Sequence, residues 1–190
     1  MKKFLTVFCL FFIVASTPAL AARPRNTKAK AAYDTGVSYG MHGRYPDAVK
    51  EFKRATEIDP SFAPAYNGWG LSLSNMGKYG EAIDKFKRAA QLDPKLTKAW
   101  YNWGGALLAI KRPAEAAEKF KKTTELDPKL APAFNNWGFA LMDQGKYDEA
   151  IAKFRQAAKF DPQSAKDLNS TIAKVNKLKE SRKAAGKRRR

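Results

Sequence analysis

The chain has 190 residues, of which 44% are hydrophobic and 28% are charged, and this composition excludes a wholly disordered protein. Its 36 lysines and arginines outnumber its 18 aspartates and glutamates, so the formal net charge is +18. The single cysteine and the single histidine exclude an internal disulfide framework and the common cysteine- or histidine-rich metal sites. We therefore expect no metal and no cofactor.

The first 21 residues have the three parts of a secretory signal peptide. Residues 1–3 are basic, residues 4–15 are apolar, and Ala19-Leu20-Ala21 supplies the small residues that a signal peptidase requires. This pattern predicts cleavage after Ala21 and a periplasmic or secreted protein. The alternative is an uncleaved inner-membrane anchor, because the uncharged stretch 4–22 nearly reaches the ~20 residues that span a bilayer. Residues 22–28 are rich in basic side chains and are expected to form a flexible leader.

A period of 34 residues organises the chain from residue 29 to residue 164. Four columns of residues keep this register over four copies, which predicts repeat units at 29–62, 63–96, 97–130 and 131–164. The columns are the Asp-Pro pairs that begin at Asp59, Asp93, Asp127 and Asp161, the glycines Gly36, Gly70, Gly104 and Gly138, the alanines Ala48, Ala82, Ala116 and Ala150, and the phenylalanines Phe52, Phe86, Phe120 and Phe154.

Each unit has the apolar spacing of two helices. In the third unit, large and small core residues follow one another at the i, i+3, i+4 and i+7 positions of one helix face, at Trp100, Trp103, Gly104 and Leu107. A turn glycine separates the two helices, and the Asp-Pro pair ends the second one, because a residue before proline is disfavoured in the α conformation. Each unit is therefore predicted to be a helical hairpin. The third unit has Lys111 in place of the turn glycine, so its turn is expected to differ.

These residues resemble the tetratricopeptide repeat family, whose pattern of the same length contains an aromatic residue, a Leu-Gly pair and later Ala, an aromatic residue and Pro. The resemblance covers residues 29–164 and implies an all-α, right-handed superhelical solenoid of four hairpins. It also implies a protein-interaction module in which the first helix of each hairpin lines a concave groove. The matching residues of the third unit are Trp100, Trp103, Gly104, Leu107, Ala116, Phe120 and Pro128.

The groove-facing positions that the resemblance implies carry amides, tyrosines and apolar side chains. An asparagine amide both donates and accepts hydrogen bonds, which suits the backbone of an extended peptide. We therefore predict a non-enzymatic scaffold that binds a peptide segment or a helix of a protein partner. The alternative is that these asparagines are polar residues of a solvated helix face. The predicted groove residues are Tyr33, Asn67, Leu71, Lys98, Tyr101, Asn102, Asn135, Asn136 and Phe139.

The C-terminal segment is predicted to be a capping helix over 165–180, followed by a disordered basic tail over 181–190. The apolar stripe Leu168, Ile172, Val175 and Leu178 would cover the last hairpin, as a solenoid requires. Residues 165–190 hold 10 basic residues and 2 acidic ones.

This charge supports a second functional hypothesis, an electrostatic adaptor whose tail binds lipid head groups, lipopolysaccharide or a cell-wall polymer while the repeats act as a rigid support. Nucleic acid is not expected as a partner if the protein is exported. A monomer or weak self-association is expected. The predicted polyanion-binding residues are Lys183, Lys187, Arg188, Arg189 and Arg190.

Overall fold

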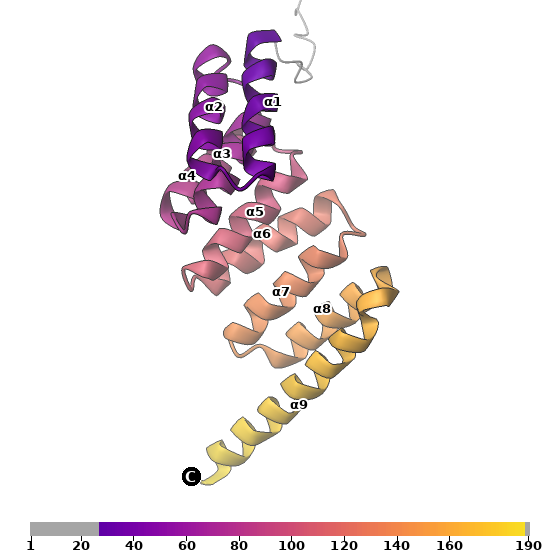
Figure 1. Ribbon diagram of the computed structural model, residues 1–190. Coiled ribbons are helices and arrows are strands. Elements are labelled where there is room, and N and C mark those ends of the chain that lie inside the picture. Colours follow the sequence, from indigo (N-terminus) through magenta and orange to yellow (C-terminus); the bar gives the residue numbers. More distant parts are fainter. Residues whose placement is uncertain (1–26, 189–190) are drawn as a thin grey trace, which may run out of the picture.

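The computed structural model describes residues 27–188, and this part of the chain is helical throughout, without β-strands (Figure 1). The predicted all-α solenoid is confirmed. Its four hairpins are α1 (Thr27–Met41) with α2 (Tyr45–Ile58), α3 (Ala63–Asn75) with α4 (Tyr79–Leu92), α5 (Thr97–Ala109) with α6 (Pro113–Leu126), and α7 (Ala131–Asp143) with α8 (Tyr147–Phe160). The short 3-10 helix η1 (Pro162–Ser164) leads into the last helix, α9 (Ala165–Arg188).

The glycine column lets the two helices of each hairpin approach closely. A Cβ atom added to Gly104 would lie 2.7 Å from Cε1 of Phe120, and the other three glycines face the phenylalanine of their own hairpin in the same way. The phenylalanines Phe86, Phe120 and Phe154 are 0% exposed. One glycine and one phenylalanine per unit therefore form the centre of each hairpin's core.

The aspartate column ends the second helix of each hairpin through its side chain as well as through the following proline. Asp93 has an extended backbone (φ −133°), and its Oδ1 accepts a hydrogen bond from the backbone N–H of Lys95 at 2.9 Å. Asp59, Asp127 and Asp161 accept equivalent bonds from the residue two positions further on. This local turn directs the chain into the next hairpin.

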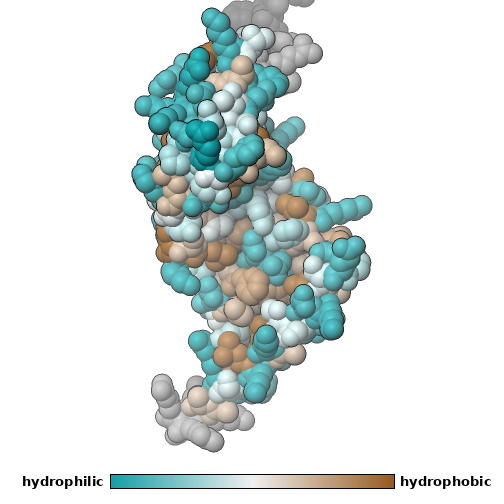
Figure 2. All heavy atoms as spheres, viewed as in Figure 1, coloured by the Kyte–Doolittle hydropathy of each residue, from teal (hydrophilic) through white to brown (hydrophobic). Residues whose placement is uncertain are grey.

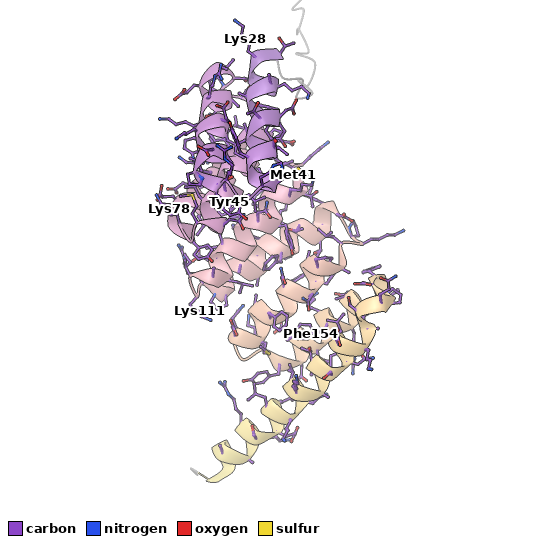
Figure 3. All side chains as sticks on the ribbon, viewed as in Figure 1. Lys28, Met41, Tyr45, Lys78, Lys111 and Phe154 are labelled. Atoms are coloured by element: carbon purple, nitrogen blue, oxygen red, sulfur yellow. The ribbon has the colours of Figure 1, made fainter. Side chains whose placement is uncertain are left out.

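The turn of the third hairpin is the same as the others, contrary to the sequence-based expectation. Lys111 has a φ of 59°, close to the 76° of Gly77 at the equivalent position. Its N–H donates to the carbonyl of Leu108, and the next N–H, of Arg112, donates to that of Leu107. These hydrogen bonds between helix end and turn hold the lysine in the left-handed conformation that glycine adopts without cost. Figure 3 shows Lys78 and Lys111 at the corresponding ends of their hairpins.

The hairpins stack in chain order with their first helices on the inner side of the superhelix. Consecutive first helices, α1 with α3, α3 with α5 and α5 with α7, contact one another, whereas consecutive second helices share no comparable interface. Because consecutive first helices lie closer together than consecutive second helices, the first helices form the concave side of the superhelix. On the face seen in Figure 2, hydrophilic side chains predominate over α1 and α2, and apolar side chains show between the helices in the middle of the stack.

Helix α9 differs from the predicted cap and tail in its length. It packs on α8 through Leu168, Ile172 and Val175, as expected for a cap, but it continues to Arg188 instead of ending at residue 180. The continuation is rich in alanine, lysine and arginine, which are strong helix formers. Leu178 is 42% exposed, and beyond Val175 the contacts with α8 are made by Lys179, which bonds to Asp148, and by Arg182, which lies over the ring of Tyr147.

The N-terminal boundary also differs from the prediction, since α1 begins at Thr27 and includes the last two residues of the predicted leader, 22–28. The predicted signal peptide, the remainder of that leader and the last two residues of the tail lie outside the described residues. Within residues 27–188, none of the helices has the length and apolar character needed to cross a membrane.

Candidate binding groove

The inner face of the first helices brings the predicted groove residues into neighbouring rows. Hydrogen bonds between side chains connect these rows across consecutive hairpins. Asn102 donates from Nδ2 to Oδ1 of Asn67 at 3.0 Å, and Asn136 donates from Nδ2 to the hydroxyl of Tyr101 at 3.1 Å. Each amide has further donor or acceptor capacity after this single bond. The asparagines thus tie adjacent repeats together and retain polar groups that a ligand could use.

The row of hydrogen bonds is interrupted between the first and second hairpins, where Gly68 stands in the position of Asn102 and Asn136. A Cβ atom on Gly68 would lie 2.6 Å from Cε1 of Phe52, so the ring occupies the place of a side chain. A hollow of about 450 Å³ opens over this point. Five of the nine predicted groove residues line it, namely Tyr33, Asn67, Leu71, Lys98 and Asn102.

The walls of this first hollow combine apolar side chains with polar groups at the rim. Met41 is 82% exposed and Leu71 is 46% exposed, and Val37 also lines the hollow. Figure 3 shows Met41 at the end of α1 beside the start of α2 at Tyr45. Met41 was not among the predicted groove residues, because it lies at the end of α1.

Two polar groups of the first hollow differ in their environment. The ring of Tyr33 packs 5.2 Å from that of Phe62 and 5.6 Å from that of Phe52, between ring centroids. Burial raises the pKa of the Tyr33 hydroxyl, and the nearby Asp34 raises it further, so this hydroxyl stays protonated as a hydrogen-bond donor at neutral pH. The exposed Lys98 amine forms no ion pair with any described residue.

A second hollow of about 350 Å³ lies at the other end of the groove, between α7, the end of α8, η1 and α9. It holds two more of the predicted residues, Asn135 and Phe139, and the ring of Phe139 lies 5.1 Å from that of Phe154. Asp161 and Asp167 also line it, and the sequence analysis missed both. The hydrogen bond from the Ser164 hydroxyl, at 2.6 Å, and those from the backbone of Ser164 and Gln163 lower the pKa of Asp161.

The outer face carries a second periodic feature, a lysine over each of three tryptophans. The Lys85 amine lies 4.2 Å from the centre of the Trp69 ring, and the same contact recurs between Lys119 and Trp103. The third contact, between Lys153 and Trp137, measures 3.8 Å, and burial lowers the pKa of this lysine. The tryptophans pack against the core, as predicted. The lysines were not predicted, although their spacing of 34 residues was visible in the sequence.

The described residues contain no group of three or more histidine, cysteine, aspartate or glutamate side chains that could hold a metal ion. The histidine ring, at the exposed end of α1, has its Nδ1 atom 2.8 Å from the carbonyl oxygen of Ser38. The arrangement of the groove is thus suited to hydrogen bonding and apolar contact along an extended surface.

Sequence models of the tetratricopeptide repeat match residues 67–131 and 131–164, which together are more than half of the chain. The chain belongs to the tetratricopeptide repeat family. Among curated protein sequences, none matches it significantly.

Solved structures of other tetratricopeptide repeat proteins resemble the fold over most of its length. A crystal structure of MamA is 26% identical, with a TM-score of 0.68 over 73% of this chain and 81% of that one. MamA from Desulfovibrio magneticus RS-1 is 23% identical, with a TM-score of 0.75 over 85% and 91%. YrrB, described as a TPR protein with an unusual peptide-binding site, is 25% identical, with a TM-score of 0.71 over 83% and 81%.

Proposed function

We propose that this tetratricopeptide repeat protein is a non-catalytic scaffold that holds an extended segment or a helix of a partner protein in its concave groove. The observation that carries the proposal is the first hollow, where exposed apolar side chains and incompletely bonded amides face the same space. The second hollow, at the far end of the same inner face, extends the surface available to a ligand.

The chemistry of the first hollow favours a peptide ligand. The remaining donor and acceptor capacity of the Asn67 and Asn102 amides can pair with backbone C=O and N–H groups, which every peptide presents along its length. Leu71 and Met41 offer apolar contact to one ligand side chain, and a volume of about 450 Å³ accommodates such a side chain with its neighbouring backbone. The similarity to YrrB, a protein with a peptide-binding site, supports the same class of ligand.

A pair of matched variants tests the groove. Leu71→Glu places a charge in the first hollow, whereas Leu178→Glu places the same charge on α9 at a leucine of similar exposure. Proteins captured from an envelope extract by the wild type should also be captured by Leu178→Glu and be lost with Leu71→Glu. The double variant Asn102→Ala/Asn136→Ala should weaken capture by about 30-fold, because it removes two hydrogen bonds that contribute about 1 kcal/mol each.

Circular dichroism would show that each variant keeps its helical content. Equal capture by all four proteins would contradict the groove proposal. Loss of capture with Leu178→Glu alone would show that the partner binds α9 and not the groove.

We further propose export of the protein to the periplasm or the medium, with cleavage after Ala21. The support is the basic, apolar and small-residue order of residues 1–21. Mass spectrometry of the N-terminus in the native host should find Ala22 as the first residue. An intact Met1 in the membrane fraction would instead support the inner-membrane anchor.

A further inference from the structure

Helix α9 presents a row of lysines on the side opposite its contact with α8. Lys166, Lys174 and Lys177 are all exposed, and their spacing of eight and three residues keeps them on one side of a helix with about 3.6 residues per turn. Leu168, with Ile172 and Val175, faces the other way and is buried. We call the three lysines the α9 lysine face.

The charges of the α9 lysine face are not neutralised by neighbouring acids. None of the three amines forms an ion pair with a described residue. On α8, Asp148 is engaged by Lys179 at 2.5 Å, on the packed side of α9. The acids of α9 itself are Asp167 and Glu180, both exposed, so two acids accompany the six basic residues of 165–183.

The outer helices are also rich in lysine and arginine, but many of these charges are locally compensated. Lys53 pairs with Glu57 at 3.7 Å, and Lys122 pairs with Glu125 at 3.3 Å. Arg54 pairs with a glutamate of its own helix in the same way. The excess positive charge of the solenoid is therefore concentrated on α9, which lies at the end of the stack and extends beyond α8 (Figure 1).

The side chains of the α9 lysine face distinguish between the polyanions that it could bind. Base edges in a DNA major groove are read by bidentate arginine, asparagine or glutamine side chains, whereas the three residues of this face are lysines, whose amines act as point charges. The α9 lysine face carries no aromatic side chain on which the bases of a single strand could stack. A row of lysines along one side of a straight helix matches a flat, negatively charged surface, to which each amine is attracted without specific geometry.

We propose that the α9 lysine face binds the surface of an anionic phospholipid membrane, independently of the groove. The predicted electrostatic role of the C-terminal region is thereby assigned to residues 166–177, and only secondarily to the tail from Lys183 onward. The phosphate-bearing head groups are the ligand.

The test is sedimentation of the full chain with phosphatidylcholine vesicles that contain or lack about 30% phosphatidylglycerol. The triple variant Lys166→Gln/Lys174→Gln/Lys177→Gln should lower the partition coefficient on anionic vesicles by about 100-fold, at roughly fivefold per lysine. The control Lys53→Gln/Lys87→Gln/Lys121→Gln removes the same number of charges from one repeated position of the second helices. It should change the partition coefficient on anionic vesicles by less than about threefold. Because every protein begins at the same residue, any contribution of the segment before α1 is common to all.

Several outcomes would overturn the proposal. An equal loss in the control variant would show that net charge, and not the α9 lysine face, drives binding. Truncation after Lys183 removes four basic residues, and if it abolishes binding while the triple variant does not, the tail is the site. Duplex DNA bound as tightly as anionic vesicles would make nucleic acid the partner. Leu71→Glu should leave vesicle binding unchanged, so the failure of either proposal can be recognised separately.

Discussion

Alanine substitutions at Gly104 and Gly105 test whether the glycine column is required for the close approach of paired helices. The two glycines are adjacent in α5, and both lie in the interior of the helix. A Cβ atom on Gly104 would lie 2.7, 2.8 and 3.0 Å from three ring carbons of Phe120. A Cβ atom on Gly105 would meet nothing within 4 Å. The pair therefore differs in steric contact while sharing the same backbone environment.

The expected magnitudes follow from two opposing contributions. Replacing glycine by alanine inside a helix raises the free energy of unfolding by about 1 kcal/mol at either position. Overpacking of a filled core costs about 1–3 kcal/mol, and this cost applies to Gly104 alone. We expect Gly105→Ala to be about 1 kcal/mol more stable than the wild type. Gly104→Ala should be about 1–3 kcal/mol less stable than Gly105→Ala, because the helix-propensity gain cancels in the comparison.

Urea denaturation followed by circular dichroism measures this difference. Repeat solenoids can unfold in more than one step, so the transition should also be followed by tryptophan fluorescence, and a single free energy should be used only where the two curves coincide. The double variant Gly104→Ala/Phe120→Leu should lose less stability than the sum of the two single variants, because the smaller side chain makes room for the methyl group. Equal stabilisation by both single variants would refute the argument that the phenylalanine excludes a side chain at this column.

Three further predictions concern the turns, the outer face and the cap. Lys111→Gly should raise the free energy of unfolding by about 1 kcal/mol, and Gly77→Ala should lower it by a similar amount. The reason is that a left-handed conformation costs a residue other than glycine about 1–2 kcal/mol. Unchanged urea midpoints would contradict this prediction. Lys119→Ala should lower the free energy of unfolding by about 0.5–1 kcal/mol more than the exposed control Lys121→Ala does, because it removes the contact with Trp103. Equal effects of the two substitutions would show that this contact does not stabilise the fold. The hydrogen bond from Ser164 lowers the pKa of Asp161 in the folded state. Ionised Asp161 therefore stabilises the fold above its unfolded pKa of about 3.9, and this contribution is lost as the pH falls through the lower pKa of the folded state. Asp161→Asn should therefore unfold more easily than the wild type near pH 7, and a difference that persisted unchanged into strong acid would disprove this linkage.

The sequence by itself determined the helices, their order and the hairpin core. The column of Gly104 and Phe120, the turn position of Gly77 and the helix end at Asp93 each depend on residues close in the chain or in strict register. Helical spacing and capping depend on residues close in the chain, so each of the four aligned repeats gives independent evidence for the same helices and helix ends. Even the predicted starts of the units at residues 63, 97 and 131 coincide with the first residues of helices.

The three-dimensional structure decided several features that the residue pattern did not indicate. Lys111 takes the same turn as the glycines because the hydrogen bonds of the hairpin outweigh its own conformational preference. Only the stacking of hairpins shows that Gly68 and Phe52 leave a hollow between the asparagine rows. Only the packing of the two helices within a hairpin shows that lysines of the second helix cover the tryptophans of the first. The contacts of the later part of α9 with α8, through Lys179 and Arg182, are likewise visible only in the folded chain. The contacts of α9 with α8 join residues about 30 or more positions apart, and Phe52 contacts Gly68 of the next hairpin, so these contacts are set by the stacking of the repeats and are absent from the local sequence pattern.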